Sequence, residues 1–219
     1  MLNYLTLMRQ VKSKKRVAEH GEVFTSEREV NAMLDLVKDE TERIESRFLE
    51  PACGDGNFLI EILRRKLKVV EFIYSKNQLD YERYAIIAIT SIYGIEIQKD
   101  NVEECRDRLY TFFIAQYKNL YPKSFKEEFL RCAKYILKSN ILHGDALNLK
   151  NPDTHEPIVF SEWSAVNSSK IKRRDYTMAN LLENQPMDGP NLFSDLGDEA
   201  FIPTPVAEFP LIHFLKIGE

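Results

Sequence analysis

The segment FLEPACGDGNF, from Phe48 to Phe58, constrains the fold more than any other stretch of the chain. Residues 47–50 are typical of a short buried strand, which Pro51 ends. A turn with Gly54 and Gly56 follows, and after it apolar residues recur at helical spacing, namely Phe58, Leu59, Ile62, Leu63 and Leu67. The order of strand, glycine turn and helix predicts an α/β unit in which free backbone amides at the helix start face a ligand.

The same alternation of strands and helices continues to residue 160. A capping box formed by Ser26 and Glu29 starts the first helix, and Asp100, with Glu103 three residues later, is expected to cap another. The predicted helices span residues 27–37, 81–92, 125–137 and a segment that begins at Asp100, and the predicted strands span residues 92–97, 141–143 and 157–160. This order predicts a parallel, doubly wound sheet with helices on both faces and a ligand beyond the carboxyl ends of its strands.

The pattern changes after Ser164, where the periodicity fades and prolines become frequent. We expect residues 1–163 to form one domain and residues 164–219 to form a proline-rich extended arm, with a short helix near residues 176–182 at most. Because prolines interrupt strand ladders, the arm is not expected to supply three further strands. Its many apolar residues predict that it packs on this domain or on a partner.

Composition excludes several classes of protein. With 219 residues, 44% of them hydrophobic, the chain can bury one core. A net charge of −4 argues against wrapping nucleic acid by bulk electrostatics. Contacts with nucleic acid would therefore be local, at Lys12–Arg16 or Lys170–Arg174, unless these basic runs are ordinary solvated faces.

No apolar run approaches the length of a membrane span and no signal segment opens the chain, which predicts a cytoplasmic protein without a membrane partner. The three cysteines, Cys53, Cys105 and Cys132, are too scattered for a disulfide framework or a zinc site. The sequence therefore predicts free thiols and no metal.

The glycine turn does not match the common phosphate-binding loops. It lacks the lysine of nucleoside triphosphate loops and the third glycine of the dinucleotide fingerprint. Glu50 and Asp55 would also repel a pyrophosphate, which makes a nicotinamide cofactor the weaker alternative. The same acids suit an ammonium or sulfonium group, while the helix start suits a carboxylate. A nucleoside that carries an amino acid has all of these groups.

Two further acids stand at the ends of the next predicted strands. Glu96 ends the second strand, where a carboxylate can accept hydrogen bonds from both hydroxyls of a ribose. Asp145 follows the third strand and can accept from an exocyclic amine such as N6 of adenine. Each acid alone is ordinary turn chemistry, but their order along the chain indicates a site for one adenosine.

Four segments resemble motifs of one protein family. Phe48–Phe58 resembles motif I of the S-adenosylmethionine-dependent DNA adenine-N6 methyltransferases, which include the modification subunits of restriction-modification systems. His20–Thr25 resembles the motif that lies N-terminally in the gamma arrangement of that family, although Ser26 stands where the family usually has proline. Tyr93–Ile97 resembles the ribose-binding motif, and His143–Leu147 resembles the adenine-contacting one.

The resemblance implies a Rossmann-like class I methyltransferase sheet, here incomplete, with S-adenosyl-L-methionine as cofactor. It also implies that DNA is a partner and that a second subunit or a homo-oligomer completes the fold. In the family's arrangement, Thr25 meets the cofactor carboxylate and Phe24 packs beside it. The implied cofactor-binding residues are Phe24, Thr25, Glu50, Ala52, Gly54, Asp55, Gly56, Glu96, Ile97, Asp145 and Ala146.

The chain departs from the family where the catalytic motif should stand. Family members carry Asn/Asp-Pro-Pro-Tyr/Phe after the fourth strand, which holds the flipped target base. At the matching distance this chain has Ser161, Glu162 and Trp163, which are the candidate catalytic residues. Glu162 could accept from an amine and Trp163 could stack on a base, but a single tryptophan at a strand end is more often part of the core.

Two functions remain open from the sequence. The first is a DNA adenine-N6 methyltransferase of a restriction-modification-like system, or the cofactor-binding portion of one. The second is a catalytically inactive methyltransferase-like subunit that acts through assembly with a partner.

Overall fold

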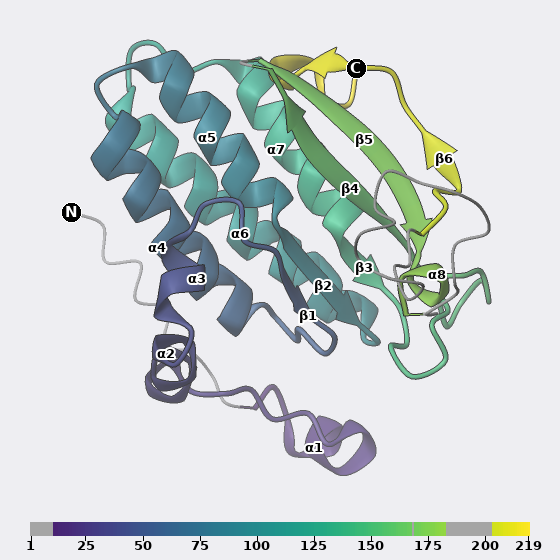
Figure 1. Cartoon of the computed structure of the whole chain (residues 1–219). Coiled ribbons are helices and arrows are strands. Elements are labelled where there is room, and N and C mark those ends of the chain that lie inside the picture. The colour runs from purple at the N-terminus through teal and green to yellow at the C-terminus, as the bar shows by residue number, and fades with distance from the viewer. Residues whose placement is uncertain (1–10, 168, 183–202) are drawn as a thin grey trace.

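The computed structural model describes residues 11–167, 169–182 and 203–219 (Figure 1). The helices are α1 (Lys14–His20), α2 (Glu27–Asp35), α3 (Lys38–Glu42), α4 (Asn57–Tyr74), α5 (Gln78–Thr90), α6 (Lys99–Leu120), α7 (Glu127–Asn140) and α8 (Met178–Leu182). The strands are β1 (Phe48–Glu50), β2 (Ile92–Glu96), β3 (Ile141–His143), β4 (Val159–Val166), β5 (Lys170–Thr177), β6 (Ala207–Glu208) and β7 (Ile212–His213), and a 3₁₀ helix, η2, spans Phe214–Lys216.

Strands β1, β2 and β3 form a parallel sheet in that order, as the alternation of strands and helices predicts. Side chains alternate between the two faces of β2. Ile92 belongs to the main core, which the helices cover. Tyr93 and Ile95 belong to a smaller apolar cluster with Phe160 and Met178. The mixed α/β class expected from the sequence is therefore present.

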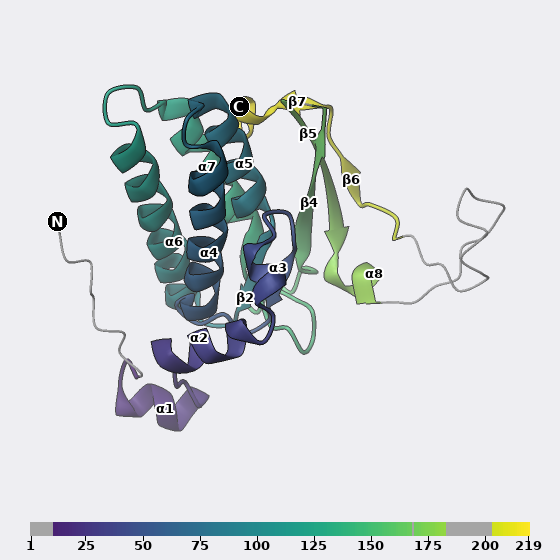
Figure 2. The ribbon, with the colours of Figure 1, turned by 60° about the vertical axis from the view of Figure 1, so that its left-hand side comes forward.

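The doubly wound arrangement predicted from the sequence is wrong for the crossover helices α4 to α7, although Met178 of α8 packs on the second face with Tyr93 and Ile95. Figure 2 shows α4 to α7 together on one side of the parallel strands. Strand β4 packs Phe160 on the opposite face of β2 and Trp163 on α7. The reason lies in the strand order, because the connections from β1 to β2 and from β2 to β3 step across the sheet in the same direction. Right-handed crossovers that step the same way place their helices on the same face.

The predicted fourth strand exists as β4, but it does not join the parallel sheet. It pairs antiparallel with β5 along its whole length, from Val159 opposite Thr177 to Val166 opposite Lys170. No helix lies between β3 and β4, and the loop between them is held by short bridges that join Asp145, Lys150 and Pro157. A strand can return parallel to its neighbour only after a long crossover, so β4 runs back instead.

The C-terminal segment is more regular than an extended arm. It supplies β5, β6 and β7, so the expectation that it cannot provide three strands is wrong. The charged residues of β5 obscure its pattern in the sequence. The short helix expected near residues 176–182 is confirmed as α8.

The C-terminal segment packs on the main core, as its apolar residues predict. Phe214 and Ile217 are buried there against the helices. The prolines and aromatic residues between residues 183 and 202 lie outside the described residues. The division into domains at residue 163 remains a prediction, although β4 continues across it.

Two helix starts differ in how well the sequence predicts them. The capping box of Ser26 and Glu29 is confirmed, with both reciprocal hydrogen bonds present. The cap predicted at Asp100 is wrong, because α6 begins at Lys99 and Gln98 occupies the cap position without a side-chain bond. The carboxylate of Asp100 binds Lys12 and Arg16 instead. The three cysteines are free, as expected, and all three are buried.

Candidate functional site

The candidate site lies at the carboxyl ends of the three parallel strands. Glu50 is aligned with Gly94 at the end of β1, and Glu96 is aligned with His143 at the end of β3. The amide of Cys53 donates to the carbonyl oxygen of Ile95 at 2.9 Å. The turn after β1 is thereby fixed beside the end of β2, which brings the predicted acids to one edge of the sheet.

Neighbouring side chains pack tightly against the glycine turn. Gly54 and Gly56 have φ angles of 53° and 92°, in the left-handed region. A Cβ atom added at Gly54 would lie 2.9 Å from Cε1 of Phe24, and one at Gly56 would lie 2.6 Å from Sγ of Cys105. Helix α4 then begins at Asn57, so its first amides lie directly after this tightly packed turn.

Glu96 faces the mouth of the turn. Its side chain is buried, its Oε2 accepts from the amide of Gly54 at 2.8 Å, and its Oε1 accepts from the amide of Gln98 at 2.8 Å. Each carboxylate oxygen has two lone pairs, so both can still accept a hydroxyl hydrogen. The carboxylate therefore keeps acceptor capacity on both oxygens at the end of β2.

Burial raises the pKa of both acids of the turn. For Glu50 the amide of Ala52 partly opposes this effect, and for Asp55 the charge of Arg108 opposes it. Oδ1 of Asp55 is buried and has no hydrogen-bond partner among the described residues. Desolvated carboxylates of this kind gain stability from a nearby cation, which suits an ammonium or sulfonium group.

Asp145 combines a turn role with a position beside the site. Its Oδ1 accepts from the amide of Leu147 at 2.8 Å, which is the ordinary turn chemistry weighed from the sequence. The preceding residue, Gly144, donates its amide to the carbonyl oxygen of Glu96 at 3.0 Å. Asp145 and Ala146 are half-buried next to the end of β2, whereas Ile97 is half-exposed.

The N-terminal motif packs against the turn. Phe24 is buried against Gly54, and the carbonyl oxygen of Thr25 accepts from Nδ2 of Asn57 at 3.0 Å. The structure therefore brings Phe24 and Thr25 to the predicted cofactor end of the sheet, although they precede β1 by more than twenty residues.

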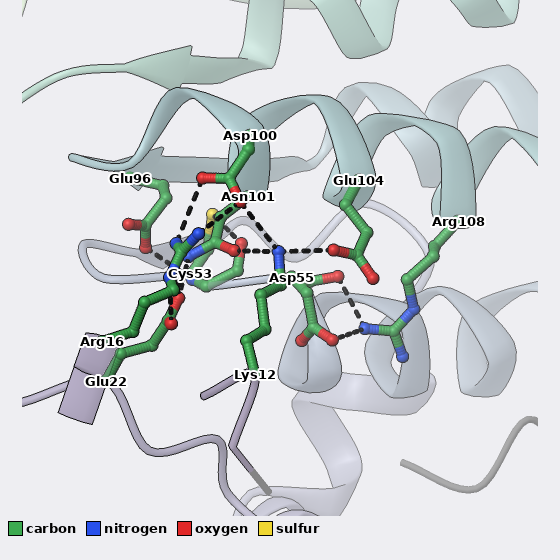
Figure 3. A network of polar contacts seen from close by, with 11 residues as sticks. Lys12, Arg16, Glu22, Cys53, Asp55, Glu96, Asp100, Asn101, Glu104 and Arg108 are labelled. Carbon is green, nitrogen blue, oxygen red and sulfur yellow. Dashed lines mark hydrogen bonds and ion pairs between the residues drawn. The ribbon is translucent and has the colours of Figure 1, made fainter. Parts of the chain in front are cut away.

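The first basic run is engaged by acids of α6 (Figure 3). Arg16 lies 2.5 Å from Asp100 and also pairs with Glu22, and Lys12 lies 2.6 Å from Glu104. The hydrogen bond from Arg16 is the main reason that the pKa of Asp100 falls to about 2. These ion pairs therefore attach the N-terminal segment to the first turns of α6.

The second basic run is likewise paired within the molecule. Lys172 lies 3.0 Å from Glu208, and Arg174 lies between Glu208 and Glu162. In the first run, Lys14 is exposed and Lys15 lies 3.8 Å from Glu19. Contact of either run with nucleic acid remains a prediction.

The structure separates the three candidate catalytic residues. Trp163 is buried and its indole N–H donates to Oδ1 of Asn140 at 2.9 Å. Ser161 and Glu162 instead line a pocket of about 460 Å³ beside β1. Glu162 pairs with Arg47, and its Oε2 is buried without a hydrogen bond in the described part of the chain. Their catalytic roles remain predictions.

Sequence reasoning missed the residues of α6 that support the site. Cys105 packs on Gly56 and Arg108 binds Asp55 at 2.7 Å. Their spacing of three places both on one helix face. A buried acid in the turn implies a cationic partner, but the sequence alone does not say which arginine supplies it.

None of the helices in the described residues is both long and apolar enough to span a bilayer.

A protein-family model described as the MmeI DNA-methyltransferase domain matches residues 24–167. No curated protein and no solved structure matches the chain. The matched region begins at Phe24 and covers the glycine turn, β2, β3 and β4, so the resemblance to restriction-modification DNA methyltransferases is confirmed. The chain belongs to the MmeI DNA-methyltransferase domain family.

Proposed function

We propose that this chain binds S-adenosylmethionine at the carboxyl ends of β1, β2 and β3 and transfers its methyl group to N6 of adenine in DNA. The observation that carries the proposal is the carboxylate of Glu96, which is buried at the end of β2 and bonded to the amide of Gly54. An acid held against a glycine turn in this way suits a ribose next to a cationic amino-acid group.

The site residues divide between the two halves of the cofactor. Thr25 and the first amides of α4 receive the carboxylate, and Glu50 and Asp55 stabilise the positive charge. Glu96 accepts from the ribose hydroxyls. Asp145 accepts from the adenine amine. The remaining cofactor-binding residues of the proposal are Phe24, Ala52, Gly54, Gly56, Ile97 and Ala146.

The protein contributes orientation more than acid–base chemistry. Bound S-adenosylmethionine supplies an already activated methyl group. The residues of the chain align the target amine with that group and exclude water, which is where most of the acceleration arises. Glu162, whose Oε2 lacks a hydrogen bond in the described residues, is the candidate to accept from the amine.

Isothermal titration with S-adenosylmethionine tests the binding proposal. We expect the wild-type chain to bind. Glu96→Ala should lose about tenfold or more in affinity, which corresponds to about 1.4 kcal/mol of binding free energy, because the variant cannot accept from the ribose hydroxyls. Glu71→Ala, which removes an exposed acid of α4, is the matched control and should bind like wild type. Absence of heat with the wild-type chain at high cofactor concentration would reject the proposal.

The second candidate is a catalytically inactive methyltransferase-like subunit. It is favoured by the burial of Trp163 in the core, where the ring cannot stack on a flipped base. A second subunit or another copy of the chain would complete such a protein, since β1 has no strand on its outer edge among the described residues.

Labelled cofactor and unmethylated DNA distinguish the two candidates. Transfer of label by the chain alone, abolished in Glu162→Ala, supports the enzyme. Cofactor binding without transfer supports the subunit.

A further inference from the structure

Arg108 lies on the face of α6 that packs against the glycine turn. Cys105, one helical turn earlier, touches Gly56 so closely that an added Cβ atom would lie 2.6 Å from its Sγ. The side chain of Arg108 is mostly buried, with 24% of its surface exposed. Burying a guanidinium is costly unless its donors are well used, so its contacts identify what it holds.

The guanidinium of Arg108 binds the last residues of the glycine turn and the first residue of α4 (Figure 3). Nη1 donates to the carbonyl oxygen of Asp55 at 2.7 Å and lies 2.7 Å from Oδ2 of the same residue. Nη2 donates to Oδ1 of Asn57 at 3.0 Å. Because the donors of a guanidinium form a rigid planar fork, these contacts fix the orientation of the turn as well as its position.

Asn57 extends this chain of contacts to the N-terminal motif. Its side chain is 5% exposed, and its Nδ2 donates to the carbonyl oxygen of Thr25 at 3.0 Å. Arg108 occupies Oδ1 of the same amide, so the amide nitrogen is directed at Thr25. One arginine thereby holds the glycine turn and, through Asn57, the segment that precedes α2.

We propose that Arg108 is a positioning residue for the amino-acid half of the cofactor. It holds Asp55, Asn57 and Thr25 in the arrangement that receives the carboxylate and the ammonium group. The inference rests on the proposed function. The nucleoside half depends on Glu96 and Asp145, which make no contact with Arg108 among the described residues and should respond less to its loss.

Two ligands separate these halves. S-adenosylmethionine carries the amino acid, and 5′-methylthioadenosine has the same nucleoside without it. We expect Arg108→Ala to weaken binding of S-adenosylmethionine about tenfold or more by isothermal titration, and to change binding of methylthioadenosine by less than about twofold. Arg108→Lys keeps the charge near Asp55 but loses the planar fork, so it should recover part of the affinity.

Arg106 provides a matched control on the same helix. It binds the carbonyl oxygens of Ile141 and Lys138, away from the turn. Arg106→Ala should therefore leave the ratio of the two affinities unchanged, even if it lowers the thermal stability. Asn57→Asp keeps the acceptor for Arg108 but removes the donor to Thr25, and it should reproduce part of the selective loss.

Hydrogen exchange tests the positioning without any ligand. In Arg108→Ala, amides of residues 22–26 and 54–58 should exchange several-fold faster than in wild type, whereas Arg106→Ala should leave both segments protected. If Arg108→Ala is too unstable to be measured, Arg108→Lys and Asn57→Asp take its place in both the titration and the exchange measurement.

Equal losses of affinity for both ligands, or unchanged exchange at the turn in a folded Arg108→Ala chain, would overturn the inference. A wild-type chain that binds neither ligand would remove the proposed function and the cofactor role of Arg108 with it. The exchange measurement would then still decide whether Arg108 holds the turn.

Discussion

The parallel sheet and the antiparallel sheet of this molecule differ in how their strands are connected. In the parallel sheet, paired helices fill each connection, α4 with α5 and then α6 with α7. Between β3 and β4 only a loop with short bridges is present. The connection between strands, more than the sequence within them, therefore decides whether a strand joins the parallel sheet.

The two sheets also use their charges differently. At the parallel edge, the carboxylates of Glu50 and Glu96 gather where the strands end. In the antiparallel sheet the charges neutralise one another, as Lys172 does with Glu208. Neither Glu50 nor Glu96 forms a salt bridge among the described residues, whereas the ion pairs of the second sheet join β5 to β6.

The largest effect is expected at the junction of the two regions. Trp163 of β4 is buried against Tyr135 of α7 and donates to Asn140. Trp163→Ala should lower the free energy of unfolding by about 3–5 kcal/mol in urea denaturation, because it leaves a large cavity. Trp163→Phe retains an aromatic ring and should lose less. A loss near zero for the alanine variant would mean that this ring does not join the regions.

The next effect concerns the glycine turn. Gly56→Ala places a methyl group at a φ of 92° against Cys105, so it should cost about 1–3 kcal/mol and weaken S-adenosylmethionine binding. Gly21 also has a positive φ, but nothing lies within 4 Å of an added Cβ atom. Gly21→Ala should therefore leave cofactor affinity unchanged in the same titration. Equal affinities in both variants would contradict the proposed role of the turn in cofactor binding.

A third test concerns a buried amine beneath the parallel sheet. Nζ of Lys66 donates to the carbonyl oxygen of Ile44 at 3.0 Å and to the hydroxyl of Ser91 at 2.7 Å. Burial lowers the pKa of Lys66 from 10.5 to about 7. Between these values the unfolded chain binds more protons than the folded chain, so stability should rise with pH, by at most about 1.4 kcal/mol per unit.

Lys66→Met removes this titration. Denaturation curves between pH 7 and pH 10 should show the rise in wild type and a smaller one in the variant. Parallel pH profiles for the two proteins would show that Lys66 does not titrate in this window.

The smallest effect is expected from the N-terminal ion pairs. Arg16 is mostly buried but its partner Asp100 is half-exposed. Asp100→Ala should therefore lower stability by about 1 kcal/mol or less, and the difference should shrink in 1 M salt. Asp100 has a lowered pKa, so its contribution is present above its unfolded pKa and is lost as the pH falls toward 2. A salt-independent loss would point to packing by α1 instead.

Local rules predicted the parts of the fold that depend on neighbouring residues. The capping box at Ser26 and the strand, turn and helix around Gly54 are set within a few residues, so the sequence revealed them. The orientation of Glu96 toward the turn also followed, because residues at the ends of adjacent parallel strands must share one edge.

The features that sequence reasoning missed depend on distant partners. Asp100 has the form of a helix cap, but Arg16 lies more than eighty residues away in the sequence and binds it instead. Residues 170–174 look like a solvated basic run, yet Ile171 lies in the core and Arg173 lies over the ring of Phe209 at 4.2 Å. Such contacts carry no local pattern, which is why β5 and Arg108 could not be read from their own segments.

The burial of Phe214 and Ile217 against α7 has a consequence for synthesis of the chain. A ribosome that has released α7 but not η2 displays a helical layer with one side still uncovered. Chaperones that bind apolar surfaces would meet this intermediate during translation. Emergence of η2 would then cover this side of α7.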